Sequence, residues 1–129
     1  MIAGSLDELA FRELPGRRAA DPLPDAAAHG VTVRVVEVSE QRRSPHVHPA
    51  CAELIHVLSG AGEHWQAGER RSLRVGDVVV VPAGVAHVTL AAPVAPATPL
   101  RLLCVFPAEG MPQTLELDGE EVRFGERQS

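Results

Sequence analysis

The sequence contains no tyrosine, no lysine and only two cysteines. Without tyrosine, the chain cannot form a cysteine–tyrosine crosslink or use a phenol group in catalysis. The two cysteines, Cys51 and Cys104, are too few for the disulfide framework of a small secreted protein. We interpret both as small buried apolar residues. Cys51 lies near two histidines in the sequence, so a role as a metal ligand stays open for it.

Long apolar runs and long runs of like charge are also missing. No stretch approaches the length of a membrane-spanning helix, and residues 1–10 lack the basic start and apolar core of a secretory signal. The net charge of −5 argues against nucleic acid as a partner. We therefore expect a cytoplasmic protein that binds neither nucleic acid nor a membrane.

The sequence does contain many short strand signals, over a length of 129 residues that suits one domain. Apolar residues alternate at the start of the segment 31–38. Asp77–Val81 is a β-branched run typical of a buried strand, and Asp118-Gly119 is a hairpin signal. Short strands separated by turn residues predict an all-β sandwich or barrel. We assign residues 31–129 to the barrel and residues 1–30 to an N-terminal strand or helix with an irregular connection.

Two stretches carry side chains suited to binding a metal. In the first, His46 and His48 lie two residues apart, so they point to the same side of an extended segment, and Glu53 follows them. In the second, His87 follows a Pro-x-Gly turn. Neutral imidazoles and a carboxylate suit a divalent transition metal. A single His-x-His pair is commonly only a surface or hydrogen-bonded feature, whereas the combination is far more specific.

These two stretches resemble the two motifs of the cupin family. The first motif, G-x5-H-x-H-x3–4-E-x6-G, is matched at four positions: His46, His48, Glu53 and Gly60. The second motif, G-x5-P-x-G-x2-H-x3-N, is also matched at four positions: Gly76, Pro82, Gly84 and His87. The departures, Glu40 for the opening glycine and Ala91 for the final asparagine, do not affect the candidate ligands.

The resemblance implies a cupin double-stranded β-helix, or jelly-roll barrel. It also implies one divalent transition metal, for which we expect zinc, with iron, manganese or nickel as alternatives. The implied ligands are His46, His48, Glu53 and His87. Family members commonly bind small molecules and form homodimers, and we expect residues 2–14 to lie at such an interface.

His64 and Gln66 stand where many family members have small apolar residues that face the barrel interior. Two polar side chains there are costly unless they serve a ligand or each other. In that case His64 is the candidate general base and Gln66 orients the substrate. Alternatively, a bulge at residues 60–62 turns the strand over, which exposes His64 and places Trp65 in the core.

The resemblance leaves three functions open. The first, which we favour, is metal-dependent proton transfer next to a carbonyl by an epimerase, isomerase or cyclase, for example on an aryl 2-oxo acid or a polyketide. The second is Fe(II)-dependent dioxygenation. The third is binding of a small molecule without catalysis. We favour an enzyme because all four ligands are present.

Composition and missing residues narrow the choice. Because all twelve basic residues are arginine and alanine, valine and proline are frequent, the sequence is typical of a high-GC genome such as that of an actinomycete. Short actinomycete members of the family include tailoring enzymes of antibiotic pathways. The missing tyrosine excludes a crosslink of the cysteine-dioxygenase type, and it argues against the metal-free His–Tyr epimerases of this family.

Overall fold

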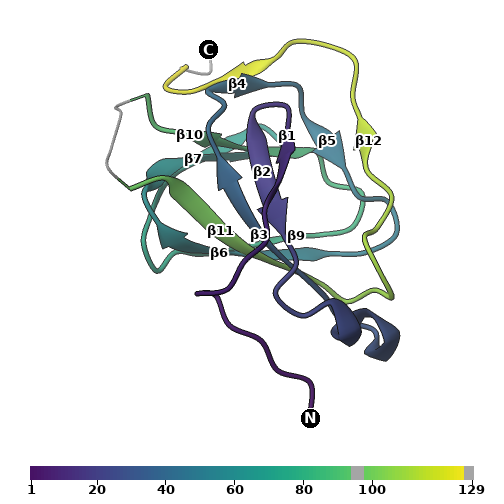
Figure 1. Ribbon diagram of the computed structural model, residues 1–129. Coiled ribbons are helices and arrows are strands. Elements are labelled where there is room, and N and C mark those ends of the chain that lie inside the picture. Colours follow the sequence, from purple (N-terminus) through teal and green to yellow (C-terminus); the bar gives the residue numbers. More distant parts are fainter. Residues whose placement is uncertain (94–97, 127–129) are drawn as a thin grey trace.

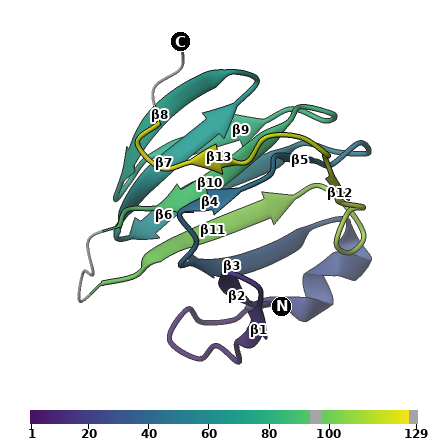
Figure 2. The same cartoon turned by 90° about the horizontal axis from the view of Figure 1, so that it is seen from above.

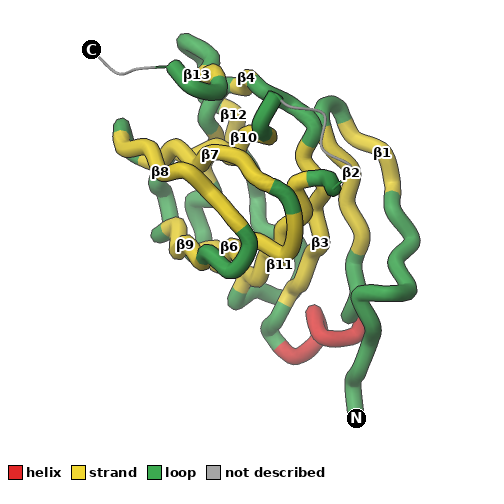
Figure 3. Tube along the Cα trace, turned by 90° about the vertical axis from the view of Figure 1, so that its left-hand side faces the viewer, coloured by secondary structure: helices red, strands yellow, loops and turns green. Residues whose placement is uncertain are grey.

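The computed structural model describes residues 1–93 and 98–126, which form two sheets that face each other and a small third sheet (Figure 1, Figure 3). The six-stranded sheet has the order β1 (Arg12–Leu14), β2 (Arg17–Ala20), β3 (Thr32–Val38), β11 (Leu100–Phe106), β6 (Glu53–Ser59) and β9 (Val78–Val81). The five-stranded sheet has the order β12 (Leu115–Glu116), β5 (His46–Val47), β10 (His87–Ala91), β7 (Ala61–Gln66) and β8 (Glu69–Arg74). The third sheet pairs β13 (Val122–Arg123) with β4 (Arg42–Arg43).

Every pairing among the described strands is antiparallel. From β5 to β12 the chain alternates between the two large sheets, except that β7 and β8 are neighbours in the five-stranded sheet. A short 3-10 helix, η1 (Pro24–His29), packs beside β3 (Figure 2). This arrangement is the predicted all-β jelly roll.

The main core lies between the two large sheets. Along β11, buried and half-buried residues alternate, as expected for a strand with one face on the core. The core is made of buried apolar residues from both sheets, including Ile55, Val57, Leu73, Val81, Ala91, Leu102 and Phe106. A second, smaller cluster joins Val88 and Leu90 of β10 to Val122 of β13, with Trp65 packed against it.

Gly60 is placed where the chain leaves β6 of one sheet and enters β7 of the other. Its φ is +77°, which side chains rarely tolerate. A Cβ atom built there would lie 2.5 Å from the carbonyl oxygen of Pro99. The crossing between the sheets therefore requires a glycine, which gives a physical reason for this position of the sequence motif.

The N-terminal region is more regular than the sequence predicts. The irregular connection expected before residue 31 contains β2, which pairs with β3, and the helix η1. β1 pairs with β2 of its own chain, so the six-stranded sheet begins before the predicted barrel boundary. The homodimer stays a prediction. Within the segment 2–14 expected at its interface, residues 12–14 pair with β2 of their own chain, and residues 2–11 belong to no strand.

The predicted strand at Asp77–Val81 is present as β9, but the prediction that it is buried is wrong. β9 is the edge of the six-stranded sheet, and its exposed and more buried residues alternate. Val78 and Val80 are 54% and 56% exposed, whereas Val81 is 2% exposed. A run of identical valines carries no alternation signal, so its sequence cannot distinguish an edge strand from a central one.

The predicted hairpin at Asp118-Gly119 is also wrong. β12 pairs with β5 and β13 pairs with β4, so the C-terminal segment runs beside residues 42–47 instead of folding onto itself. Val122 is buried, and Phe124 packs against the smaller cluster. These apolar contacts outweigh the local turn signal.

Two valines of β9 test this placement with the same substitution. Val81→Ala is expected to lower the free energy of unfolding by about 2 kcal/mol, because it removes buried methyl groups and leaves a cavity. Val78→Ala is expected to change it by about 0.5 kcal/mol or less, because that side chain is largely exposed. Urea unfolding of both variants measures the difference, and equal losses would contradict the edge position of β9.

Candidate metal centre

Three of the predicted ligands come together in one cluster. His46 on β5 and His87 on β10 are direct partners across the five-stranded sheet. His48 follows β5, and its ring centroid lies 5.4 Å from that of His46 and 5.2 Å from that of His87. One nitrogen from each of the three rings lies within 4.8 Å of the other two. The alternation predicted for the His-x-His pair therefore places both side chains in one cluster.

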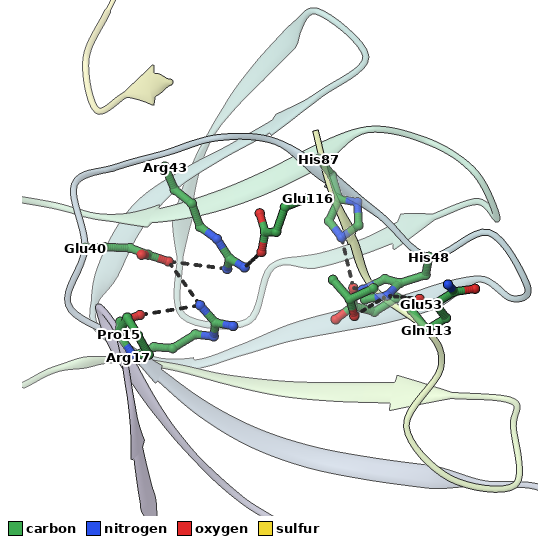
Figure 4. Close-up of polar contacts among 10 residues, drawn as sticks. Pro15, Arg17, Glu40, Arg43, His48, Glu53, His87, Gln113 and Glu116 are labelled. Carbon is green, nitrogen blue, oxygen red and sulfur yellow. Dashed lines mark hydrogen bonds and ion pairs between the residues drawn. The ribbon is translucent and has the colours of Figure 1, made fainter. Parts of the chain in front are cut away.

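Glu53 reaches the cluster from β6 of the opposite sheet. Its Oε1 atom lies 3.4 Å from His48 Nε2 and 3.2 Å from His87 Nε2 (Figure 4). The side chain is almost fully buried. The group of mutually close ligand atoms contains only the three histidines. Glu53 contacts two members of this group, His48 and His87.

A hydrogen bond on the far side of the His87 ring fixes which of its nitrogens carries the proton. His87 Nδ1 lies 2.9 Å from the Val85 carbonyl oxygen, which only accepts, so Nδ1 donates. Nε2 of the neutral His87 ring therefore has the lone pair that a metal would take. His48 Nδ1 lies 3.3 Å from the Gln113 carbonyl oxygen and 3.1 Å from the Thr114 hydroxyl, which can either donate or accept.

His46 supports the same interpretation. Its Nδ1 atom is buried and has no hydrogen-bond partner within residues 1–93 and 98–126. A buried, unpartnered nitrogen is costly in a folded protein. Three imidazoles, one unsatisfied nitrogen and a carboxylate are a donor set that fits a divalent transition metal.

The charge states of the cluster also suit a metal. Burial, with the neighbouring His87 and Arg43, lowers the pKa of His46 to about 2, so its ring is neutral at pH 7. Burial alone would raise the pKa of Glu53, but its contacts with His48 and His87 outweigh this effect and lower the pKa to about 2. Metal ligands must be unprotonated, and both groups meet that condition.

A cavity opens beside the cluster. Ile55, Leu102 and Phe106 of the main core line it, whereas their core neighbour Val57 does not. At its other side Glu40 pairs with Arg17 and Arg43, and Arg43 also pairs with Glu116 (Figure 4). The lining therefore joins the histidines, an apolar wall and a group of arginines.

His64 and Gln66 lie on the interior face of β7. Of the two alternatives left open by the sequence, the structure has the one in which His64 is buried, at 3% exposure, and Trp65 lies on the outer face. His64 is nevertheless absent from the described residues that line the cavity, whereas Thr89, its partner across the sheet, lines it. His64 is therefore not placed to contact a substrate in this cavity directly.

Two threonines of the site were given no role from the sequence. Thr114 Oγ1 lies 3.1 Å from His48 Nδ1, and Thr89 Oγ1 lies 3.0 Å from His64 Nδ1. Alternation along the strand predicts that Thr89 shares a face with His87, but not that it contacts His64. Cys104 lines the cavity, and Cys51 packs against the core; both thiols are free.

Comparison with known proteins agrees with this geometry. Residues 32–106, more than half of the chain, match the family Cupin_2, the cupin domain, so the chain belongs to that family. A search among curated proteins finds no match. No helix among the described residues has the length and apolar character needed to cross a membrane.

Solved structures share the fold at low identity. KdgF from Halomonas sp. is 24% identical with a TM-score of 0.66, and the match covers 81% of this chain and 94% of that one. The polyketide cyclase RemF from Streptomyces resistomycificus is 18% identical with a TM-score of 0.72, covering 93% and 87%. The Streptomyces nucleoside dehydratase Pac13 is 17% identical with a TM-score of 0.63, covering 94% and 90%. At these identities the similarity establishes the fold.

The candidate centre can be tested by metal binding. Wild-type protein is expected to bind one equivalent of Zn²⁺ and to gain thermal stability from it, because binding is linked to folding. His87→Ala is expected to weaken the affinity by more than about 100-fold, which exceeds the usual effect of losing an outer partner of a ligand. His56→Ala is the matched control, since His56 lies on the opposite face of β6 from Glu53. Calorimetric titration that finds equal affinities in the two variants would contradict the assignment.

The lowered pKa values predict a pH dependence of the metal-free protein. Because the pKa of His46 falls from 6.5 to about 2 on folding, the stability from its neutral ring is complete above about pH 6.5 and is lost as the pH falls. Glu53 acts in the same direction below about pH 4.5. The free energy of unfolding, measured in chelator, is expected to fall from pH 6.5 to 4.5. The fall should be shallower in His46→Gln, and an unchanged slope would show that His46 does not cause it.

Proposed function

We propose that this protein is a metal-dependent enzyme that moves a proton next to a carbonyl group of a small molecule, as an epimerase, isomerase or cyclase does. The proposed metal ligands are His46, His48, Glu53 and His87, and the proposed metal is zinc. One observation carries the proposal: a directed chain of hydrogen bonds leads from the cavity wall to a buried histidine beside the ligand cluster.

The direction of this chain follows from its two ends. Gln66 Nε2 donates to the Val80 carbonyl oxygen, at 3.4 Å, so Gln66 Oε1 faces His64. That oxygen only accepts, so His64 Nε2, 2.9 Å away, carries the proton. His64 Nδ1 is then the free nitrogen, and it accepts from the Thr89 hydroxyl, 3.0 Å away.

Thr89 is therefore the group that would touch a substrate, and His64 acts through it. The Thr89 oxygen can take a proton from the cavity while it passes its own proton to His64 Nδ1. Gln66 keeps His64 in the tautomer that can accept. Burial lowers the pKa of His64, partly offset by the hydrogen bond with Gln66, so the ring is neutral and able to accept at neutral pH.

When bound, a divalent metal would polarise a carbonyl oxygen and acidify the adjacent C–H bond. The cavity lining contributes the remaining contacts with the substrate. The apolar wall formed by Ile55, Leu102 and Phe106 suits the organic part of a keto compound and limits access of water. RemF, one of the structurally similar proteins, is a polyketide cyclase, and this supports a polyketide or related keto compound as substrate.

Solvent deuterium exchange into aryl 2-oxo acids and polyketide-like ketones tests the proposal. Zn²⁺-loaded wild type is expected to catalyse exchange. Thr89→Val is expected to lower the rate by about 100-fold or more, since it removes the hydroxyl but keeps the shape. Thr89→Ser is the matched control and should retain most of the rate. Exchange that survives unchanged in Thr89→Val would remove Thr89 from the mechanism.

The role of His64 is tested by a pH profile. In wild type, exchange is expected to fall on the acid side, where His64 becomes protonated, and His64→Ala should lose both most of the rate and this dependence while still binding metal. Oxygen uptake coupled to turnover would instead place the protein with the dioxygenases. Ligand binding without exchange for any substrate would favour a binding protein.

A further inference from the structure

Arg34 is the one arginine of the cavity lining whose side chain makes no hydrogen bond or ion pair with residues 1–93 and 98–126. It lies on β3, and its Nε atom is buried without a partner. Alternation places Arg34 on the same face as Val36 and Val38, which also line the cavity. A buried guanidinium nitrogen without an acceptor is costly, so the site favours a ligand that supplies one.

The other two arginines of the lining are already neutralised. Arg17 and Arg43 share Glu40, and Arg43 also pairs with Glu116. The carboxylate whose charge acts most strongly on Arg34 is that of Asp21, but Asp21 accepts a hydrogen bond from the Leu23 backbone N–H and forms no ion pair with Arg34. On its other side Arg34 borders a hollow shared with Arg12, which adds positive charge. The positive charge that remains free at this wall therefore belongs mainly to Arg34.

Arg34 and the candidate metal ligands line the same cavity, but they are carried by different segments of the chain. Arg34 stands on β3, opposite Cys104 of β11, whereas the histidines come from β5, β10 and the loop after β5. The apolar residues Val36 and Leu102 also line it. A ligand that spans this cavity would meet the metal ligands with one group, apolar side chains with its middle and a guanidinium with its other end.

We propose that Arg34 forms a carboxylate-binding subsite, so that the substrate is a keto compound with a carboxylate remote from the group that meets the metal. This inference rests on the proposed function and specifies its substrate class. A guanidinium matches a carboxylate through two parallel hydrogen bonds. A single free guanidinium balances one negative charge, which favours a carboxylate over the more highly charged phosphate.

The test uses ligand binding to Zn²⁺-loaded protein, without turnover. The probes are oxaloacetate, 2-oxoglutarate and 2-oxoadipate, diacids of increasing length, each paired with the ester of its distal carboxylate. Both members of a pair keep the same 2-oxo acid end. Wild type is expected to bind at least one diacid tenfold or more tightly than its ester, in calorimetry at low salt. Equal binding of diacid and ester at every length, or no binding of any probe, would overturn the proposal.

Variants then assign the preference to Arg34. Arg34→Gln is expected to lose the preference for the diacid and to leave the affinity for the ester unchanged, whereas Arg34→Lys should keep part of it. Arg71→Gln, the same substitution at an exposed position on β8, is the control and should keep all of it. A preference that persists in Arg34→Gln would overturn the assignment, as would tighter binding of a phosphate analogue than of the diacid.

The two proposals can fail separately. If the diacid preference depends on Arg34 but no substrate exchanges its proton, the carboxylate subsite stands and the proton-transfer function falls. If exchange occurs equally well with diacids and esters, the function stands and the subsite falls. Should Arg34→Gln unfold, the comparison of diacid with ester in wild type and in Arg34→Lys still decides the outcome.

Discussion

The buried carboxylate of Glu53, facing the imidazoles of His48 and His87, is the interaction on which the rest of this structure depends. Glu53 belongs to one large sheet, and His87 belongs to the other. An ionised group in the interior is costly unless partners compensate it. The two sheets must therefore keep the separation and register that hold these side chains together, and a bound cation would strengthen that constraint.

The cavity beside this cluster has a consistent chemical order. The histidines and Glu53 form one part, an apolar wall lies next to them, and arginines of β2, β3 and β4 complete the lining. The hydrogen bonds that link Thr89, His64 and Gln66 begin at Thr89, which lines the cavity near His87. Under the proposed function, each feature would act on a different part of a substrate, so a keto acid of moderate size could use all of them at once.

The sequence predicts the cluster well because its signals are local. Two histidines two residues apart share a face in any extended segment, and the glycine at residue 60 is required by one crossing of the chain. The distance between His46 and His87 follows from strand pairing, which only the family motifs implied. His46 and His87 are 41 positions apart in the sequence, so spacing alone could not have predicted that the four side chains form one cluster.

Features set by long-range contacts could not be predicted. β12 and β13 are two residues long, and their partners are selected by packing, such as that of Val122 on β10. Whether His64 faces inward depends on the register of β7 against β10, which places it opposite Thr89. Nothing in the sequence distinguishes Arg34 from the other arginines, because only the fold shows that Arg17 and Arg43 already pair with Glu40.

X-ray absorption spectroscopy of the zinc-loaded protein reports the atoms bound to the metal. We expect one metal with nitrogen and oxygen ligands at about 2.0–2.2 Å and the outer scattering of three imidazole rings. A sulfur ligand from Cys51 or Cys104, or a shell without imidazole, would show that the three histidines and Glu53 do not bind the metal.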